Sequence, residues 1–199
     1  GGDTLLVDGF EGLVIINPSE TTLFRYGKVG VRRKKLKNLV EEDAKEPALT
    51  KDGQPFQLFA NADTPEEVNA AIESACEGVG LFRTEALFLR KNEMPTEEVQ
   101  FAHYRELVEA AKPLSVTIRT LDLGGDKVLS QGDREQENNP FMGFRAIRYC
   151  LQNPETFLLQ LRAILRASAF GNVKLMFPMI SGVGEVIRAK VLLERAKRH

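Results

Sequence analysis

The chain has 199 residues, of which 43% are apolar, and its formal net charge is −1. This apolar content suffices for one sizeable core, so we expect a globular protein. A nearly neutral charge balance gives no bulk attraction to nucleic acid or to an anionic membrane. The apolar runs are far shorter than the roughly 18 residues that a membrane-spanning helix needs, and the N-terminus lacks a signal-peptide pattern. We therefore expect a cytoplasmic protein that binds neither nucleic acid nor membrane.

The cysteines and histidines offer little chemistry. Cys76 and Cys150 lie in helical patterns without C-x-x-C or zinc-ligand spacing, so buried free thiols are the favoured interpretation. His103 lies within a helical pattern and His199 is the last residue. Neither histidine is placed as a catalytic group would be.

Residues 1–16 are predicted to form a β-hairpin, and residues 17–47 a helical linker. Two β-rich runs flank Asp8-Gly9 and Glu11-Gly12, which is typical hairpin turn chemistry. A helix then begins with Asn17 as N-cap, followed by Pro18 and the capping-box residue Glu20. The basic run at 32–39 is followed by acidic residues and lacks aromatics, so it is interpreted as a solvated helix face.

From residue 56 onward, strand and helix patterns alternate. Strands are predicted at 56–61, 79–82, 115–118 and 173–179, with Pro178 placed where the last one ends. The helices between them begin with capping patterns at Thr64, Thr96 and Asn153, and a further helix pattern reaches the C-terminus. These elements make four βα units, and residues 48–199 are assigned to one α/β domain.

Repeated βα units imply parallel strands, because parallel neighbours require crossover connections. Two architectures satisfy this requirement, a doubly wound sheet and a (β/α)8 barrel. A barrel takes about 250 residues, and residues 56–199 offer little more than half of that. If the fold is a TIM-type barrel, the chain holds its first half.

Basic side chains recur where the predicted strands end. Arg83 follows the second strand and Arg119 the third, while Lys127 and Arg145 lie in and after the long third loop. In parallel α/β folds, sites form at the C-terminal ends of strands. Guanidinium forks match phosphate and carboxylate oxygens and stay charged when partly buried. The pattern predicts a site for a small, multiply charged anion.

A purely structural role is the alternative. Arg83 and Arg119 could simply pair with nearby carboxylates, namely those of Glu85, Asp122 or Asp126. For one such arginine the two interpretations are about equally strong, whereas two in matching positions favour the site. Arg162 and Arg166 lie at helical spacing, where ordinary surface or interface roles are favoured.

Four ordered motifs carry a family resemblance. They are "EGVGLFRTE" (77–85), "RTLDLGGDK" (119–127), "ENNPFMGFRAIR" (137–148) and "LRAILRASAFGNVKLMFPMI" (161–180). Together they resemble the enzyme I family of the phosphoenolpyruvate:sugar phosphotransferase system, along nearly the whole chain. The "LGGDK" stretch resembles enzyme I more than the related dikinase or phosphoenolpyruvate synthase.

The resemblance implies a fold and a function. Residues 48–199 would be the first half of a (β/α)8 barrel whose mouth binds phosphoenolpyruvate and Mg²⁺. Residues 1–16 would be the last hairpin of a swivelling phosphohistidine domain, and 17–47 its helical linker. In the family, phosphate passes from phosphoenolpyruvate to a histidine and then to a histidine-containing phosphocarrier protein, which drives sugar uptake. By motif position, the substrate-binding residues would be Arg83, Arg119, Lys127 and Arg145.

Several family features have no counterpart here. The sequence shows no segment like the active-site histidine region, no later-strand carboxylates for Mg²⁺, and no match to the cysteine that protonates enolpyruvate. Ala86 follows "RTE", where an aromatic residue is usual, and "LRKN" (89–92) replaces an acidic stretch. We therefore expect a segment that is inactive alone and that associates with itself through its open sheet edges, in a family expected to form homodimers. A non-catalytic partner-binding or regulatory module remains the competing hypothesis.

Overall fold

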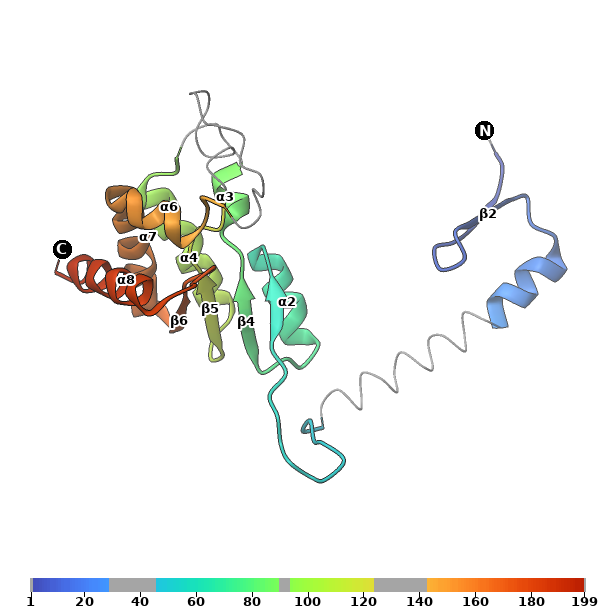
Figure 1. The fold of residues 1–199 in the computed structure, drawn as a ribbon. Helices are drawn as coiled ribbons and strands as arrows, with labels where there is room; N and C mark the ends of the chain where they lie inside the picture. Colours follow the sequence, from blue (N-terminus) through green and yellow to red (C-terminus); the bar gives the residue numbers. More distant parts are fainter. Residues whose placement is uncertain (1, 29–45, 90–93, 124–142, 199) are drawn as a thin grey trace. The chain divides into compact units, whose positions relative to one another are not determined.

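The structure, a computed structural model, describes residues 2–28, 46–89, 94–123 and 143–198. The chain divides into two units, Gly1–Pro47 and Ala48–His199, each of which is described by itself (Figure 1). The first unit contains the predicted hairpin, with β1 (Leu5–Asp8) antiparallel to β2 (Leu13–Ile16). The Asp8 carboxylate accepts hydrogen bonds from the backbone N–H groups of Phe10 (2.9 Å) and Glu11 (3.3 Å), which fixes the turn.

The helix after the hairpin starts later than predicted. Residues 20–28 are helical, and the Ser19 hydroxyl accepts a hydrogen bond from the Thr22 N–H (3.2 Å), so Ser19 is the N-cap. The prediction that Asn17 caps this helix was wrong. Its side-chain oxygen instead accepts from the Thr4 N–H (2.9 Å), which ties the two ends of the hairpin together. Residues 29–45 of the predicted linker lie outside the described residues.

The second unit is built on a parallel sheet. Its strands are β3 (Ala60–Ala62), β4 (Gly78–Phe82), β5 (Ser115–Arg119) and β6 (Asn172–Met176), in the spatial order β3-β4-β5-β6. Each neighbouring pair is parallel, as predicted from the alternation of strand and helix patterns. Pro178 follows β6 rather than interrupting it.

Helices connect the strands. They are α2 (Pro65–Glu73), α3 (Glu85–Leu89), α4 (Glu97–Ala110), α6 (Ile147–Gln152), α7 (Pro154–Ala167), which continues into a 3-10 turn (Ser168–Phe170), and α8 (Val183–Ala196). The predicted caps of α2 and α4 are confirmed, because the Thr64 hydroxyl accepts from the Glu67 N–H (3.3 Å) and the Thr96 hydroxyl from the Val99 N–H (3.4 Å). The five-residue helix α3 was not predicted.

The first strand is shorter than its sequence pattern. The run from Phe56 favours a strand, but β3 begins only at Ala60, and Phe56 is 46% exposed. The preceding backbone turns back on itself instead, since the Phe56 N–H donates to the Ala48 carbonyl (3.0 Å). The β propensity of these aromatic and aliphatic residues was overridden by this local pairing.

One face of the sheet is covered by helices. A single core joins alternate strand residues to apolar residues of α2, α4 and α7, including Val68, Tyr104, Val116, Ile118 and Ile164. Figure 1 shows these helices ranged along the sheet in chain order. A second core packs α6, α7 and α8 around Leu121, Phe157 and Leu161.

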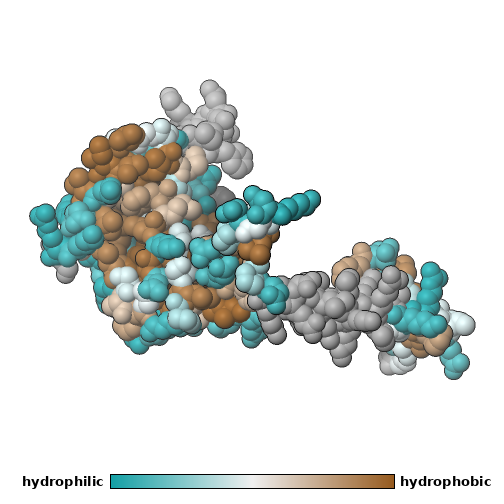
Figure 2. Space-filling model, turned by 90° about the horizontal axis from the view of Figure 1, so that it is seen from below, coloured by the Kyte–Doolittle hydropathy of each residue, from teal (hydrophilic) through white to brown (hydrophobic). Residues whose placement is uncertain are grey.

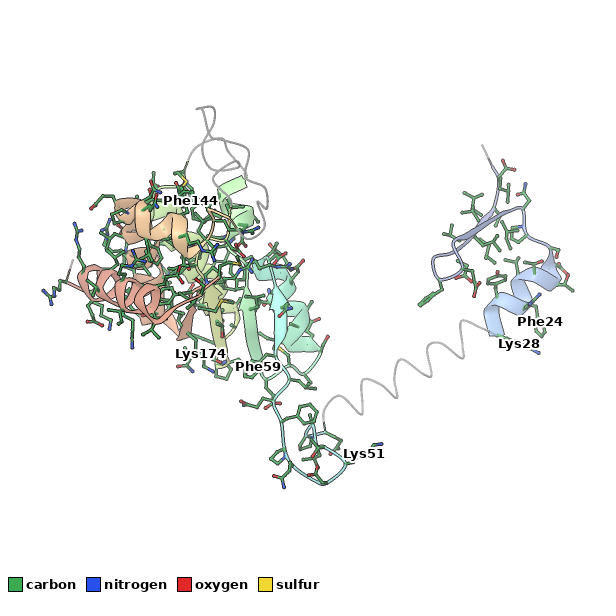
Figure 3. All side chains as sticks on the ribbon, in the orientation of Figure 1. Phe24, Lys28, Lys51, Phe59, Phe144 and Lys174 are labelled. Carbon is green, nitrogen blue, oxygen red and sulfur yellow. The ribbon has the colours of Figure 1, made fainter. Side chains whose placement is uncertain are left out.

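The opposite face carries smaller and more polar side chains. Parallel register sets Thr117 of β5 beside Lys174 of β6, and Ser115 beside Asn172. Phe59 also lies here, packed so closely on β4 that a Cβ added at Gly80 would sit 2.7 Å from the Phe59 Cβ. The Lys174 ammonium lies 5.5 Å from the centre of the Phe59 ring (Figure 3). Among the described residues, therefore, only one face has a helical layer, unlike a doubly wound sheet.

Ion pairs connect α4 with α7. The Glu97 carboxylate accepts hydrogen bonds from Arg162 (2.7 Å) and Arg166 (3.0 Å), and the Arg166 guanidinium lies 4.1 Å from the centre of the Phe101 ring. Burial opposes ionisation of Glu97, but the two arginines outweigh it and lower the pKa of this carboxyl below its usual value of 4.5. The surface or interface role favoured for Arg162 and Arg166 matches these contacts, which join α7 to α4.

Replacing Glu97 by Gln should reduce the free energy of unfolding by about 1 kcal/mol at pH 7, because one partly exposed carboxylate serves two arginines. A carboxyl with a lowered native pKa stabilises the fold above its unfolded pKa, and this contribution disappears as pH falls through the native value. Urea unfolding at pH 7 and at decreasing pH below 4.5 should show the difference shrinking toward zero. Glu155→Gln, at an exposed carboxylate paired with Arg195, is the matched control, and an equal loss there would contradict the interhelical role.

Candidate anion site at the strand ends

Parallel register brings the two strand-end arginines to one edge of the sheet. Phe82 pairs with Ile118, so Arg83 and Arg119 follow directly at the same level of neighbouring strands. Hydrogen bonds extend the ladder one step further, from the Arg83 N–H to the Ala62 carbonyl (3.2 Å) and from the Thr120 N–H to the Met176 carbonyl (3.0 Å). Both arginines therefore lie at the C-terminal edge of the sheet.

Arg119 lies at the centre of a cluster of charges. One guanidinium nitrogen donates to Glu85 Oε1 (2.9 Å), and another pairs with Asp122 Oδ2 (3.2 Å). The side chains of all three residues are at most 20% exposed. Glu85 Oε1 also accepts from the Asp122 N–H (3.1 Å), so the carboxylate at the start of α3 braces the loop after β5.

Arg145 joins this cluster through the same aspartate. Its Nη2 lies 2.9 Å and its Nε 3.0 Å from Asp122 Oδ1, and Nη2 also donates to the Asp122 carbonyl (3.1 Å). Arg145 lies just before α6. It is presented by a turn at Ala146, a buried residue whose φ of 53° is unusual for a residue with a Cβ.

Arg83 has a different partner. Its Nε bonds to Asp63, which follows β3, and its side chain is 48% exposed. The structure therefore brings Arg119 and Arg145 together on Asp122, while Arg83 is held on the neighbouring strand end. Lys127, the fourth predicted site residue, lies outside the described residues.

The described cluster is balanced in charge but not in hydrogen bonding. Arg119 and Arg145 face the two carboxylates of Glu85 and Asp122. Three buried atoms, Arg119 Nε, Glu85 Oε2 and Thr120 Oγ1, have no hydrogen-bonding partner within the described ranges. A buried N–H that is already held in place and lacks an acceptor is suited to bind an oxygen of an anion.

Comparison with known proteins identifies the family of the chain. Residues 37–199 match the family described as PEP-utilising enzyme, PEP-binding domain. The chain belongs to this family. The resemblance indicated by the four sequence motifs is confirmed by this match and by the curated relatives named next.

Three curated relatives of the chain share one name. Proteins named phosphoenolpyruvate-protein phosphotransferase are similar to it at 45% identity in Staphylococcus carnosus, 44% in Geobacillus stearothermophilus and 44% in Priestia megaterium, each over 98% of this chain. The alignments cover only 34–35% of the relatives. The chain thus spans about a third of their length.

Residues that could hold Mg²⁺ are not found in the described ranges, where no group of three or more histidine, cysteine or acidic side chains is gathered for a metal. Glu85 and Asp122 are occupied by arginines. The described residues of this PEP-binding domain therefore do not fit a metal ion. None of the helices in the same ranges is long and apolar enough to cross a bilayer.

One residue near the cluster was not foreseen from the sequence. Gln160 is only 2% exposed, and its side chain reaches the loops after both β4 and β5. Its signal was its position in α7, on the apolar stripe between Phe157 and Ile164. A polar residue on the buried face of a helix must find hydrogen-bonding partners in the interior.

The thiol of Cys150 should be unreactive in the folded protein. Burial, with a smaller contribution from Asp122, raises its pKa to about 12, so about 0.01% is thiolate at pH 8. Cys76 is only partly buried. We expect one rapidly reacting thiol with an aromatic disulfide reagent at pH 8, and a second only after denaturation. Cys76→Ser should abolish the fast phase, whereas two fast equivalents in the native protein would contradict the burial of Cys150.

Proposed function

We propose that this chain is the anion-binding half of a phosphoenolpyruvate site in a phosphotransferase. The observation that carries the proposal is Arg119, held by Glu85 and Asp122 yet retaining a buried Nε–H without an acceptor in the described residues. Arg83, Arg145 and Lys127 are proposed to bind the same substrate. Phosphoenolpyruvate carries a phosphate and a carboxylate, and forked guanidinium donors match both groups.

The proposed reaction moves the phosphoryl group to a histidine of the enzyme and then to a histidine-containing phosphocarrier protein, for sugar uptake. The name shared by the curated relatives supports this activity. In such a transfer, positive charge steadies the equatorial oxygens of the phosphoryl group and the negative charge that develops on the departing enolate. Neither the acceptor histidine nor a Mg²⁺ site is assigned to the described residues, so the chain is proposed to act within a larger protein in the cytoplasm.

A half barrel is the proposed architecture of residues 48–199. Its support is the one-sided covering of the sheet, since a (β/α)8 barrel keeps helices outside and lines its interior with the other face. Residues 1–16 are proposed as the final hairpin of a phosphohistidine domain and 17–47 as its linker. Large apolar side chains of the hairpin are exposed within their own unit, Val7 by 69% and Phe10 by 83%, as expected for part of a larger domain.

The activity can be tested in a chimera, in which these 199 residues replace the matching third of the Staphylococcus carnosus enzyme. This chimera should phosphorylate the phosphocarrier protein from phosphoenolpyruvate, while the chain alone should release no pyruvate above background. Arg119→Ala in the chimera should lower kcat/KM by about 100-fold or more, because a preorganised positive charge is lost. Arg105→Ala, which removes an exposed arginine paired with Glu109 on α4, should stay within about twofold. Normal kinetics for Arg119→Ala would remove this residue from the site, and an inactive chimera would contradict the proposed function.

Self-association of the isolated chain is the second expectation. The outer strands β3 and β6 leave backbone groups open to pairing, and α8 exposes Val183, Ile187 and Val191 by 57–75%. Figure 2 shows hydrophobic residues reaching the surface of the larger unit. Light scattering should give a mass that rises with concentration through the micromolar range, toward a homodimer. A constant monomer mass would contradict the proposal, and Ile187→Glu separates pairing through α8 from pairing through the strand edges.

A further inference from the structure

A buried chain of hydrogen bonds lies beneath the arginine cluster. At its centre, Gln160 Nε2 donates to the hydroxyls of Thr84 (3.3 Å) and Tyr104 (3.2 Å), and Gln160 Oε1 accepts from the Leu121 N–H (3.0 Å). The side-chain amide thereby bonds to three separate parts of the fold, the loop after β4, helix α4 and the loop after β5. Thr84 and Tyr104 are 1% and 0% exposed, so water does not compete for these bonds.

The network has one consistent direction. The Thr84 hydroxyl accepts a hydrogen bond from Gln160. Its own hydrogen is therefore free to donate to the Arg119 carbonyl (3.0 Å). At the other end, the Tyr104 hydroxyl donates to Gln100 Oε1 (3.3 Å), and Gln100 Nε2 donates to the Pro95 carbonyl (2.9 Å). Each hydroxyl has one hydrogen, so this set of partners admits one amide orientation for each glutamine.

The residues that Gln160 holds are neighbours of the charged residues. Thr84 stands between Arg83 and Glu85 in the chain, and Leu121 directly precedes Asp122. One amide therefore fixes the backbone from which Glu85 and Asp122 reach Arg119. Buried polar groups with every partner in place make a site rigid, and loss of one partner leaves the others unsatisfied.

We propose that Gln160 and Thr84 are positioning residues for phosphoenolpyruvate binding, which hold the strand-end loops so that the Arg119 and Arg145 guanidiniums keep the geometry that the anion needs. This inference rests on the proposed function. Neither residue is proposed to contact the substrate. They act through the backbone at Arg119 and Leu121, where small displacements move a guanidinium out of alignment with its ligand.

Two buried glutamines provide a matched comparison. Gln160→Met and Gln100→Met each replace a 2%-exposed amide by an apolar side chain of similar length, and each removes a bond to Tyr104, but only Gln160 touches the strand-end loops. Both variants should lower Tm by similar amounts. Calorimetric titration of the full chain with phosphoenolpyruvate should show about tenfold weaker binding for Gln160→Met and less than about twofold for Gln100→Met. Equal weakening in both would overturn the positioning role.

A ligand-free measurement separates this inference from the proposed function. In chain labelled with ¹⁵N-arginine, Gln160→Met should shift or broaden the Nε–H signals of Arg119 and Arg145, whereas Gln100→Met should leave them in place. If the unaltered chain binds no phosphoenolpyruvate, the proposed site fails, while the arginine signals still decide whether Gln160 positions these side chains. Unchanged Arg119 and Arg145 signals in Gln160→Met would overturn the inference.

A pair of variants at Thr84 covers the case in which Gln160→Met does not fold. Thr84→Ser keeps the hydroxyl that links Gln160 to the Arg119 carbonyl, and Thr84→Val keeps the shape without it. Thr84→Ser should retain the arginine signals and bind within about threefold of the unaltered chain, whereas Thr84→Val should reproduce the Gln160→Met changes. Identical behaviour of the two variants would overturn the positioning role of the Thr84 hydroxyl.

Discussion

The mostly buried guanidinium of Arg119 sets the requirements that the surrounding structure meets. An arginine stays charged in the folded protein, and a charge removed from water needs a partner and hydrogen bonds. Glu85 and Asp122 provide both, with carboxylate oxygens 2.9 and 3.2 Å from the guanidinium nitrogens. Asp122 also pairs with Arg145, which follows the long third loop. The strand ends are thereby tied to α3 and to the turn before α6. The same carboxylates that satisfy the arginines also orient them.

Charge neutrality gives the cluster a particular character. A site with only arginines would attract an anion strongly, but its side chains would repel one another and spread. With one carboxylate for each guanidinium, Arg119 and Arg145 are held in place before any ligand arrives, and binding costs less reorganisation. In the proposed anion site, selectivity would depend on the few donors left over, of which Arg119 Nε is one within the described ranges. This balance explains why the network around Gln160 matters, since a preorganised site depends on the precision of its supports.

Local chemistry in the sequence predicted most of the fold that positions the site. Patterns only a few residues long were enough to predict several elements. These are the caps at Thr64 and Thr96, the apolar stripes of α4 and α7, and the β-branched strand at 115–119. Parallel pairing then required Arg83 and Arg119 to share an edge.

The predictions that were wrong also have physical reasons. Phe56 carries strong β propensity but folds back toward Ala48, and Ser19 outcompeted Asn17 as a cap because Asn17 serves the hairpin. Pairings between distant residues, such as Asp122 with Arg145 or Gln160 with Leu121, have no local signature.

The buried polar groups also bear on the choice between an anion site and a binding module without chemistry. A surface that only binds partner proteins needs exposed side chains that complement the partner. Arginines that are buried at the strand ends would contribute nothing to such binding. Here the Arg119 Nε–H and Thr120 Oγ1 are buried without partners in the described chain, which costs stability. Residues of this kind collect where a ligand completes the hydrogen bonding, and an apolar substitution at Thr120 would otherwise stabilise the fold. Their presence at the strand ends, together with membership in the PEP-binding family, favours the anion site over the module.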